Sequence, residues 1–374
     1  MKKINFITAY APEDRGGGWN GVNAHLYEGL RRRFEVVYVG PINPGPCRAA
    51  CLISRFKKLC GLPREFYHYS RRRLDRISRR VQAQADPGAA FDFHHGAAPW
   101  SACTSPRPYG GYIDASFDTY ISLYHHRPAF AKADIRRICS REAQWLAGAA
   151  AAFCASEWTL RQTVEAYGLP ERNFRVAGIG GNAAIPRGPG EARGLDFVFI
   201  AWDFARKGGL LCAEAFSQVH KVYPQATLTI VSQRPPDSVL QLSGVRYVGL
   251  LRKSNPDEAR RFEEILGSAF AIVHPTTMDT IAQILIDVAY HGCPAVASNT
   301  FAIPEVVKDG VTGFLVTPPL TAAAFAEKML QLCRDRSGYL RMREAARSFS
   351  TETLTWESVV GRIAQFIESH DRST

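Results

Sequence analysis

The sequence lacks any apolar run long enough to cross a membrane. A spanning helix needs about 20 consecutive apolar residues, whereas the apolar segment 147–155 is short and rich in alanine. The chain starts with a strand-like segment, residues 4–8, so we expect no secretory signal. A hydrophobic content of 46% and a charged content of 22% are typical of a globular protein. We therefore expect a cytoplasmic protein, built of two domains because 374 residues exceed one ordinary core.

Metal-binding patterns are also missing. The nine cysteines are odd in number, and the closest pair, Cys47 and Cys51, has no second pair at zinc spacing. The ten histidines form no metal motif, and no Asp-x-Asp triplet occurs. We expect no metal site, and we expect the cysteines to be buried, reduced thiols.

Positive charge is concentrated in one segment. The chain carries a net charge of +11, and residues 47–82 hold eleven Lys or Arg against Glu65 and Asp75, a local +9 (11 − 2 = 9). Such a cluster attracts anionic lipid surfaces, nucleic acids or acidic polymers.

Within this segment, residues 64–85 have the spacing of an amphipathic helix, with Leu74, Ile77 and Val81 on one face. The arginines around them are either a solvated face or a contact for an anionic membrane or acceptor. The segment lacks the interleaved aromatic residues of single-strand platforms, so we expect no nucleic acid partner.

The most informative stretch is 270–317. It predicts a buried strand over 270–273, a polar turn over 274–280, a helix over 281–290 that ends at Gly292, and a second strand over 294–298. Strand, helix and strand in this order imply a parallel crossover. Ligands bind at the carboxyl ends of such strands, and the free N–H groups of a helix start suit a phosphate.

Two acids flank the predicted helix start, Asp279 and Asp287, eight positions apart, which is about two turns or ~12 Å if both lie on the helix. Spacing alone favours the simpler interpretation, in which one is an N-cap Asp and the other an incidental acid. The stretch, however, resembles the donor-binding signature of family 4 glycosyltransferases with the GT-B fold. That signature has two Glu residues separated by seven positions. A strand and a Pro-Glu-Val-Val-like loop follow them. The present sequence departs from the signature at three positions, with Asp in place of both Glu residues and Ala282 in place of a usual Gly. It agrees with the signature at Gly292, Pro294, Pro304 and Glu305.

The N-terminal part begins another strand–loop–helix–strand unit, with strands over 4–8 and 35–39 and a helix over 22–33. Its loop contains the glycines 16–18. Gly17 and Gly18 form either an ordinary turn or, as the resemblance implies, a loop that lets donor phosphates or the acceptor approach closely.

Three further segments resemble one branch of the family: Tyr112–Phe117, Cys154–Trp158 with Tyr167-Gly168, and Gly178–Asn182. Asp114 in the first would lie at a strand's carboxyl end. It is a helix cap or, as the resemblance favours, a catalytic residue facing the acceptor.

A linker rich in Pro and Gly is predicted over 183–194. After the strand 197–200, Trp202–Gly209 resembles the branch's Lys-Asp-Phe-Glu-Arg-Lys-Gly-Gly segment. Lys207 matches the basic residue that holds the donor diphosphate, whereas a lone lysine at a helix start is otherwise only solvated. Trp202 replaces the first basic residue, and Arg206 is a candidate substitute.

The resemblance implies an α/β fold of two doubly wound, Rossmann-like domains facing across a cleft. We expect an acceptor domain over 1–185, completed by a C-terminal helix over 357–374, and a donor domain over 195–350. Asp279 would bind sugar hydroxyls and Asp287 the ribose. Asp114, Asp279 and Lys207 are the catalytic candidates, and the remaining donor-binding candidates are Gln233, Arg234, Leu250, Ile281, Ala282 and Gln283.

The implied activity is retaining transfer of a hexose from a UDP- or GDP-linked sugar to an acceptor hydroxyl, in glycan or glycolipid assembly. The nucleotide sugar is a co-substrate, and neither metal nor other cofactor is expected. Partners would be the nucleotide sugar, a glycan or lipid-linked acceptor, and an anionic membrane at the inner face through residues 47–82. Three alternatives remain: a nucleotide-sugar isomerase or hydrolase, a glycosyltransferase-like protein with impaired activity, and a basic lipid- or nucleic-acid-binding protein.

Overall fold

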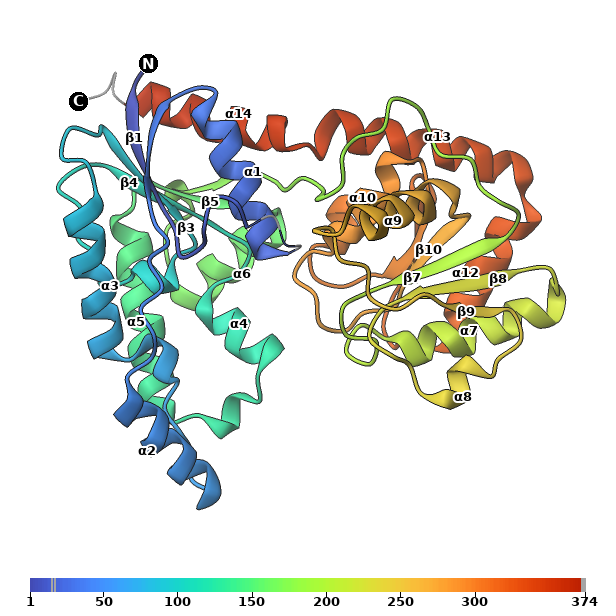
Figure 1. Ribbon diagram of the computed structural model, residues 1–374, viewed down its shortest axis with the longest axis horizontal. Helices are drawn as coiled ribbons and strands as arrows, with labels where there is room; N and C mark the ends of the chain where they lie inside the picture. The colour runs from blue at the N-terminus through green and yellow to red at the C-terminus, as the bar shows by residue number, and fades with distance from the viewer. Residues whose placement is uncertain (15, 17, 371–374) are drawn as a thin grey trace. The chain divides into compact units, whose positions relative to one another are not determined.

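The computed structural model describes residues 1–14, 16 and 18–370, which form two compact units (Figure 1). The N-terminal unit comprises Met1–Asp14, Trp19–Gly178 and residues 356–370, and the C-terminal unit comprises Gly16, Gly18 and Ile179–Thr355. The chain thus enters the C-terminal unit at Ile179, whereas the sequence predicted the linker over 183–194.

The N-terminal unit is built on a six-stranded sheet in which every pair of neighbouring strands is parallel. The strand order β2-β1-β3-β4-β5-β6 reverses direction between β1 and β3, which defines a doubly wound topology. Strands β1 and β3 are almost wholly buried, as expected where helices cover both faces of a parallel sheet. The strands are β1 (Lys3–Ile7), β2 (Glu35–Val39), β3 (Phe91–His95), β4 (Tyr109–Ile113), β5 (Ala151–Cys154) and β6 (Phe174–Val176).

The described residues of this unit form seven α-helices, and the last of them comes from the C-terminal part of the chain. They are α1 (Trp19–Arg31), α2 (Arg48–Leu59), α3 (Arg71–Gln84), α4 (Phe117–Tyr124), α5 (Lys132–Gly148), α6 (Glu157–Tyr167) and α14 (Trp356–Ser369).

The helix predicted over 64–85 is wrong in its first part, and α2 was not predicted. Helix α3 starts only at Arg71, because Arg64 instead exchanges backbone hydrogen bonds with the segment at Phe130. Phe66 is buried in a small cluster with Phe117 and Phe130, which holds this segment out of the helix. Contacts with residues far away in the sequence therefore stabilise a non-helical conformation of this segment.

The C-terminal unit repeats the same architecture. Its six parallel strands follow the order β12-β11-β10-β7-β8-β9. They are β7 (Asp196–Ile200), β8 (Thr227–Val231), β9 (Val245–Tyr247), β10 (Ala271–His274), β11 (Ala295–Ser298) and β12 (Gly313–Val316). The helices are α7 (Gly209–Val222), α8 (Asp237–Leu240), α9 (Pro256–Ser268), α10 (Gln283–Tyr290), α11 (Ile303–Val306), α12 (Ala322–Arg334) and α13 (Arg336–Thr353).

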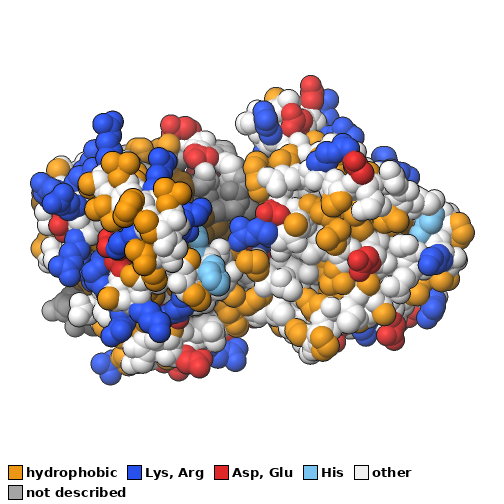
Figure 2. Space-filling model, turned by 90° about the horizontal axis from the view of Figure 1, so that it is seen from below, with side chains coloured by type: hydrophobic (Ala, Val, Ile, Leu, Met, Phe, Trp, Pro, Cys, Tyr) orange, Lys and Arg blue, Asp and Glu red, His pale blue; other side chains and the backbone are white. Residues whose placement is uncertain are grey.

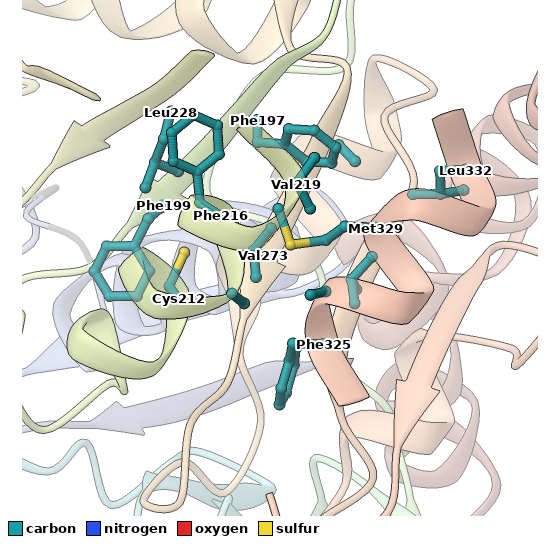
Figure 3. Packing of buried hydrophobic residues seen from close by; sticks show 14 of the residues in the cluster. Phe197, Phe199, Cys212, Phe216, Val219, Leu228, Val273, Phe325, Met329 and Leu332 are labelled. Atoms are coloured by element: carbon teal, nitrogen blue, oxygen red, sulfur yellow. The ribbon is translucent and has the colours of Figure 1, made fainter. Parts of the chain in front are cut away.

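Buried side chains from β7, α7 and α12 form the core that fixes the central strands of this unit (Figure 3). Phe197 of β7, Phe216 of α7 and Met329 of α12 are all fully buried. Burying side chains of this size stabilises the fold by roughly 1.5–3 kcal/mol each. This packing holds the carboxyl ends of β7 and β10, where the candidate site lies, in fixed positions.

Two further expectations can be compared with the described residues. None of their helices combines the length and apolarity required to cross a membrane. All nine cysteines are free thiols, but only Cys154, Cys212 and Cys293 are buried. The expectation of buried thiols is therefore wrong for the other six, of which Cys60 is exposed.

Candidate functional site

Two loops meet at the carboxyl ends of the neighbouring strands β7 and β10. The first carries Lys207 and Gly208, and the second begins at Pro275. Gly208 has a φ of +80°, and a Cβ atom there would lie 2.2 Å from the Pro275 carbonyl oxygen. Only glycine permits this conformation and this approach, so the glycine after Lys207 brings the lysine against the second loop.

Lys207 and Asp279 form an ion pair between these loops. The Lys207 Nζ lies 2.8 Å from Asp279 Oδ2 and donates a hydrogen bond to the Met278 carbonyl oxygen at 2.8 Å. His274 Nε2 lies 3.5 Å from the same carboxylate oxygen. Burial alone would raise the pKa of Asp279, but His274 and the charge of Lys207 outweigh it and lower the pKa. Asp279 is therefore ionised at neutral pH.

Helix α10 begins at Gln283, two residues later than predicted. Asp279 thus lies in the preceding loop, so the two acids do not share a helix face. The first amides of a helix have no partner within the helix, and the N-terminal end carries partial positive charge. Ile281 and Ala282, both buried, lead into this end next to the Lys207–Asp279 pair.

Asp287 is buried inside the C-terminal unit and binds backbone rather than facing open solvent. Its Oδ1 accepts hydrogen bonds from the amides of Asn182 at 2.5 Å and Ala183 at 2.8 Å, and Lys253 Nζ lies 3.9 Å from Oδ2. Burial raises the pKa of Asp287, although Lys253 and these amides oppose the shift. A Cβ atom at Gly181 would lie 2.5 Å from Oδ1, so this glycine is required for the contact.

Gln283 supports the same loop from the first residue of α10. Its side-chain oxygen accepts from Asn182 Nδ2 at 3.0 Å, and its side-chain nitrogen donates to the Gly180 carbonyl oxygen at 2.9 Å. Gln283 and Asp287 therefore hold the loop 180–183 against α10. Their assignments to the donor stay predictions.

The other donor-binding candidates are spread over nearby strand ends. Gln233 follows β8, and its amide donates to the Trp202 carbonyl oxygen at 3.1 Å, which joins it to the Lys207 loop. Arg206 and Arg234 are exposed, and Arg234 pairs with Asp237 at 2.8 Å. Leu250 is half-buried and Gly18 is exposed, whereas Gly17 lies outside the described residues.

The N-terminal unit has a pocket of about 380 Å³ at the carboxyl ends of β3 and β4. Asp114 lines it, one residue beyond β4. The alternative role of Asp114 as a helix cap is wrong, because Ser116 caps α4 by accepting a hydrogen bond from the Thr119 amide at 3.2 Å. Asp114 thus stays a candidate for the acceptor side.

His95 is a lining residue that the sequence reasoning missed. It ends β3, and its ring stacks on Trp19 with 4.5 Å between ring centroids. Both ring nitrogens are buried without a hydrogen-bond partner among the described residues. Burial lowers the pKa of His95 to about 3, so the ring is neutral. Its place at a strand's carboxyl end is the signal that could have identified it.

Glu142 of α5 lines the same pocket and was also missed. It accepts hydrogen bonds from the Tyr167 hydroxyl and, at 2.7 Å, from the Phe117 amide. Burial raises the pKa of Glu142 to about 7, although these hydrogen bonds oppose the shift. The sequence around Glu142 has only the pattern of an ordinary helix, so no local signal was available.

Comparison with known proteins adds to this geometry. Residues 195–335 match the family model described as "Glycosyl transferases group 1". This segment of the C-terminal unit is therefore similar to the group 1 glycosyl transferases. Its matched residues include Lys207, Asp279 and Asp287.

A curated relative, a phosphatidyl-myo-inositol mannosyltransferase of Mycobacterium tuberculosis, is 25% identical over 182 residues. This match covers 47% of the present chain and 48% of the relative, so it spans about half the length of the curated relatives.

Solved structures show the same fold. A sucrose-phosphate synthase of Thermosynechococcus elongatus has a TM-score of 0.71 at 15% identity and full coverage of both chains. HepE of Anabaena, in complex with UDP and glucose, has a TM-score of 0.64 at 14% identity, covering 99% of this chain and 100% of its own. WaaG, a glycosyltransferase involved in lipopolysaccharide biosynthesis, has a TM-score of 0.64 at 12% identity, covering 98% and 99%. The predicted GT-B fold is confirmed.

Proposed function

We propose that the protein is a retaining glycosyltransferase that moves a hexose from a UDP- or GDP-linked sugar to an acceptor hydroxyl in glycan or glycolipid assembly. The observation that carries this proposal is the Lys207–Asp279 pair at the start of α10. It lies within the segment that is similar to the group 1 glycosyl transferases. The mannosyltransferase relative and the HepE complexes with UDP and UDP-glucose agree with a nucleotide-sugar donor.

Lys207 is the proposed ligand of the donor diphosphate. An ammonium has three donors, and two of them point to Asp279 and to the Met278 carbonyl oxygen. The third can bind a phosphate oxygen, supported by the positive end of α10 and the amides of residues 281–283. Asp279, kept ionised by Lys207, is positioned to accept hydrogen bonds from sugar hydroxyls, with Asp287 assigned to the ribose.

The proposed step needs no enzymatic nucleophile. The acceptor oxygen bonds to the anomeric carbon on the face from which the diphosphate departs, and the bond between that carbon and the phosphate oxygen breaks. The acceptor's proton passes to the departing phosphate oxygen, so configuration is retained and charge balances. Lys207 stabilises the charge that develops on the diphosphate, so the protein acts by positioning and electrostatics.

The acceptor is assigned to the N-terminal unit. Its pocket of about 380 Å³ combines the carboxylate of Asp114 with aromatic rings that include Trp19 and Tyr10. Asp114 can accept a hydrogen bond from an acceptor hydroxyl, and neutral His95 can serve as donor or acceptor without adding charge. We include in the proposal that residues 47–82 contact an anionic membrane and that the reaction requires no metal ion.

The decisive experiment is calorimetric titration with UDP, GDP and their hexose derivatives, followed by product analysis. We expect one nucleotide to bind, and labelled sugar to move to a glycan or lipid acceptor with retained configuration. Nucleotide binding with sugar release in the absence of any acceptor would favour a hydrolase, and binding without turnover an impaired enzyme. Absence of nucleotide binding would overturn the proposal.

A further inference from the structure

Helix α2 presents its apolar side to the solvent. Fourteen large hydrophobic residues are exposed among the described residues, and five of them fall within residues 52–62. Their exposed fractions are 64% for Leu52, 51% for Ile53, 65% for Phe56, 86% for Leu59 and 54% for Leu62. A patch of this kind on a globular protein marks an interaction site.

The orientation of α2 is the reverse of that of an ordinary surface helix. Leu52, Phe56 and Leu59 follow the spacing i, i+4 and i+7, which places them on one face. Ser54, on another face, is the buried residue of the helix, and Lys57 is half-buried. A surface helix normally buries its apolar stripe and exposes its polar face, so packing against the protein does not explain these three residues.

Basic side chains border this apolar face. Helix α2 itself carries Arg48, Arg55 and Lys58, whereas the half-buried Lys57 pairs with Glu65 at 3.2 Å. Next to its first turn, Arg48 and the α3 residues Arg72, Arg76 and Arg79 line a concavity of about 540 Å³, which also includes Asp75. Figure 2 views the molecule from the side on which α2 projects in Figure 1, and it shows hydrophobic side chains framed by Lys and Arg.

Helix α3 cannot supply the apolar contact that its sequence suggested. Leu74, Ile77 and Val81 are buried in the core of the N-terminal unit. Arg73 is also buried and donates hydrogen bonds to the Pro44 and His68 carbonyl oxygens. The helix contributes arginines only, and the apolar surface of the basic segment belongs to α2.

We propose that α2 lies in the plane of an anionic lipid bilayer, with Leu52, Phe56 and Leu59 inserted among the acyl chains. The flanking lysines and arginines would then lie at the level of the lipid phosphates, as in interfacial amphipathic helices. This inference rests on the surface contact proposed for residues 47–82, and it names the element and the mode of attachment. A second copy of the chain is disfavoured as the occupant, because a two-fold contact would place these basic rims against each other.

The test compares a triple variant, Leu52→Ser, Phe56→Ser and Leu59→Ser, with a matched control, Val222→Ser, Val311→Ser and Leu340→Ser. The control residues are also exposed large hydrophobic residues, at 54%, 55% and 50%, but they lie in the C-terminal unit. Sedimentation uses full-length protein with phosphatidylglycerol–phosphatidylcholine vesicles and with pure phosphatidylcholine vesicles. Both variants are also titrated with UDP and GDP, since unchanged nucleotide binding separates a failed attachment from a failed glycosyltransferase assignment.

We expect the unaltered protein and the control to bind the anionic vesicles, and the triple variant to bind them at least tenfold more weakly. Raising the salt from ~0.1 M to ~1 M shortens the Debye length from ~10 Å to ~3 Å and weakens only the charge contact. A fraction of the unaltered protein should therefore stay bound. Equal binding by the triple variant, complete release by salt, or equal binding to neutral vesicles would overturn the inference.

A second readout follows insertion directly. In a Phe56→Trp variant, brominated lipids should quench the added fluorescence, measured as the difference from the unaltered protein. A tryptophan outside the acyl region would not be quenched, and this result would also overturn the inference. A dimer in solution that dissociates in the triple variant would show that a second copy covers the face instead.

Discussion

Each unit holds a buried carboxyl group near the strand ends of its sheet, and the two groups differ in charge. Glu142 in the N-terminal unit is held by a hydroxyl and a backbone amide, and burial raises its pKa to about 7. Asp279 in the C-terminal unit has Lys207 at 2.8 Å and His274 at 3.5 Å, and its pKa is lowered. At Asp279 the His274 hydrogen bond and the charge of Lys207 therefore outweigh burial, whereas at Glu142 burial dominates.

The difference shows how one architecture provides two kinds of site. Both sheets have six parallel strands, and both place polar groups at the carboxyl ends of the strands. In the C-terminal unit these groups are charged, and the proposed function assigns the donor diphosphate to them. In the N-terminal unit the pocket combines the Asp114 carboxylate with aromatic rings and the uncharged His95, and the proposed function assigns the acceptor to it.

The largest expected effect concerns Glu142. Its pKa lies above the usual value of 4.5 in the folded state, so between pH 4.5 and about 7 the folded state binds a proton that the unfolded state has lost. Stability should therefore fall as the pH rises through this window, by at most about 3 kcal/mol, and level off above it. Urea unfolding at several pH values checks this. The Glu142→Gln variant should lose this pH dependence of the free energy of unfolding. The control variant Glu165→Gln, at an exposed position, should keep it.

Lys207→Ala should weaken binding of the donor or the nucleoside diphosphate by about tenfold to hundredfold. A charged hydrogen bond to phosphate contributes roughly 1.5–3 kcal/mol, and Asp279 would lose its cation. Calorimetry measures the affinity, with Lys221→Ala on α7 as the matched control. Unchanged affinity in the Lys207 variant would show that the diphosphate binds elsewhere.

Asp287→Ala should act on both stability and binding. The change leaves the amides of Asn182 and Ala183 without their acceptor, which costs roughly 1–3 kcal/mol. If Asp287 also binds the ribose, nucleotide affinity should fall by a larger factor than the affinity for free sugar. Asp287→Asn retains an acceptor for the amides and so separates the two roles. Equal losses for nucleotide and sugar in both variants would leave Asp287 with the structural role alone.

The smallest expected effect is that of removing divalent cations. Because Lys207 and the start of α10 supply the positive charge in the proposed mechanism, treatment with EDTA should leave the transfer rate unchanged within error. The measurement is the initial rate before and after chelation. Loss of activity that Mg²⁺ or Mn²⁺ restores would contradict the proposed metal independence.

Local sequence patterns were sufficient for much of the fold. The strand predicted over 35–39 matches β2, and the helix predicted over 281–290 ends, as α10 does, at Tyr290. Both predictions rest on hydrophobic periodicity and on helix-ending residues, which can be recognised within a short stretch of sequence. Lys207 and Asp279 were singled out by the resemblance of their segments to family motifs that follow a strand, and their roles stay predictions. The structure then brings the two motifs together.

The sequence could not decide which way an apolar face points. Leu52, Phe56 and Leu59 have the spacing of a helix that packs on a core, just as Leu74, Ile77 and Val81 do. Only the tertiary structure shows that the second set is buried and the first exposed, because burial depends on which distant segments cover each face. The same reason applies to Glu142 and Asp287, whose pKa values are raised by burial and whose hydrogen-bond partners lie 25 and 105 positions away in the chain.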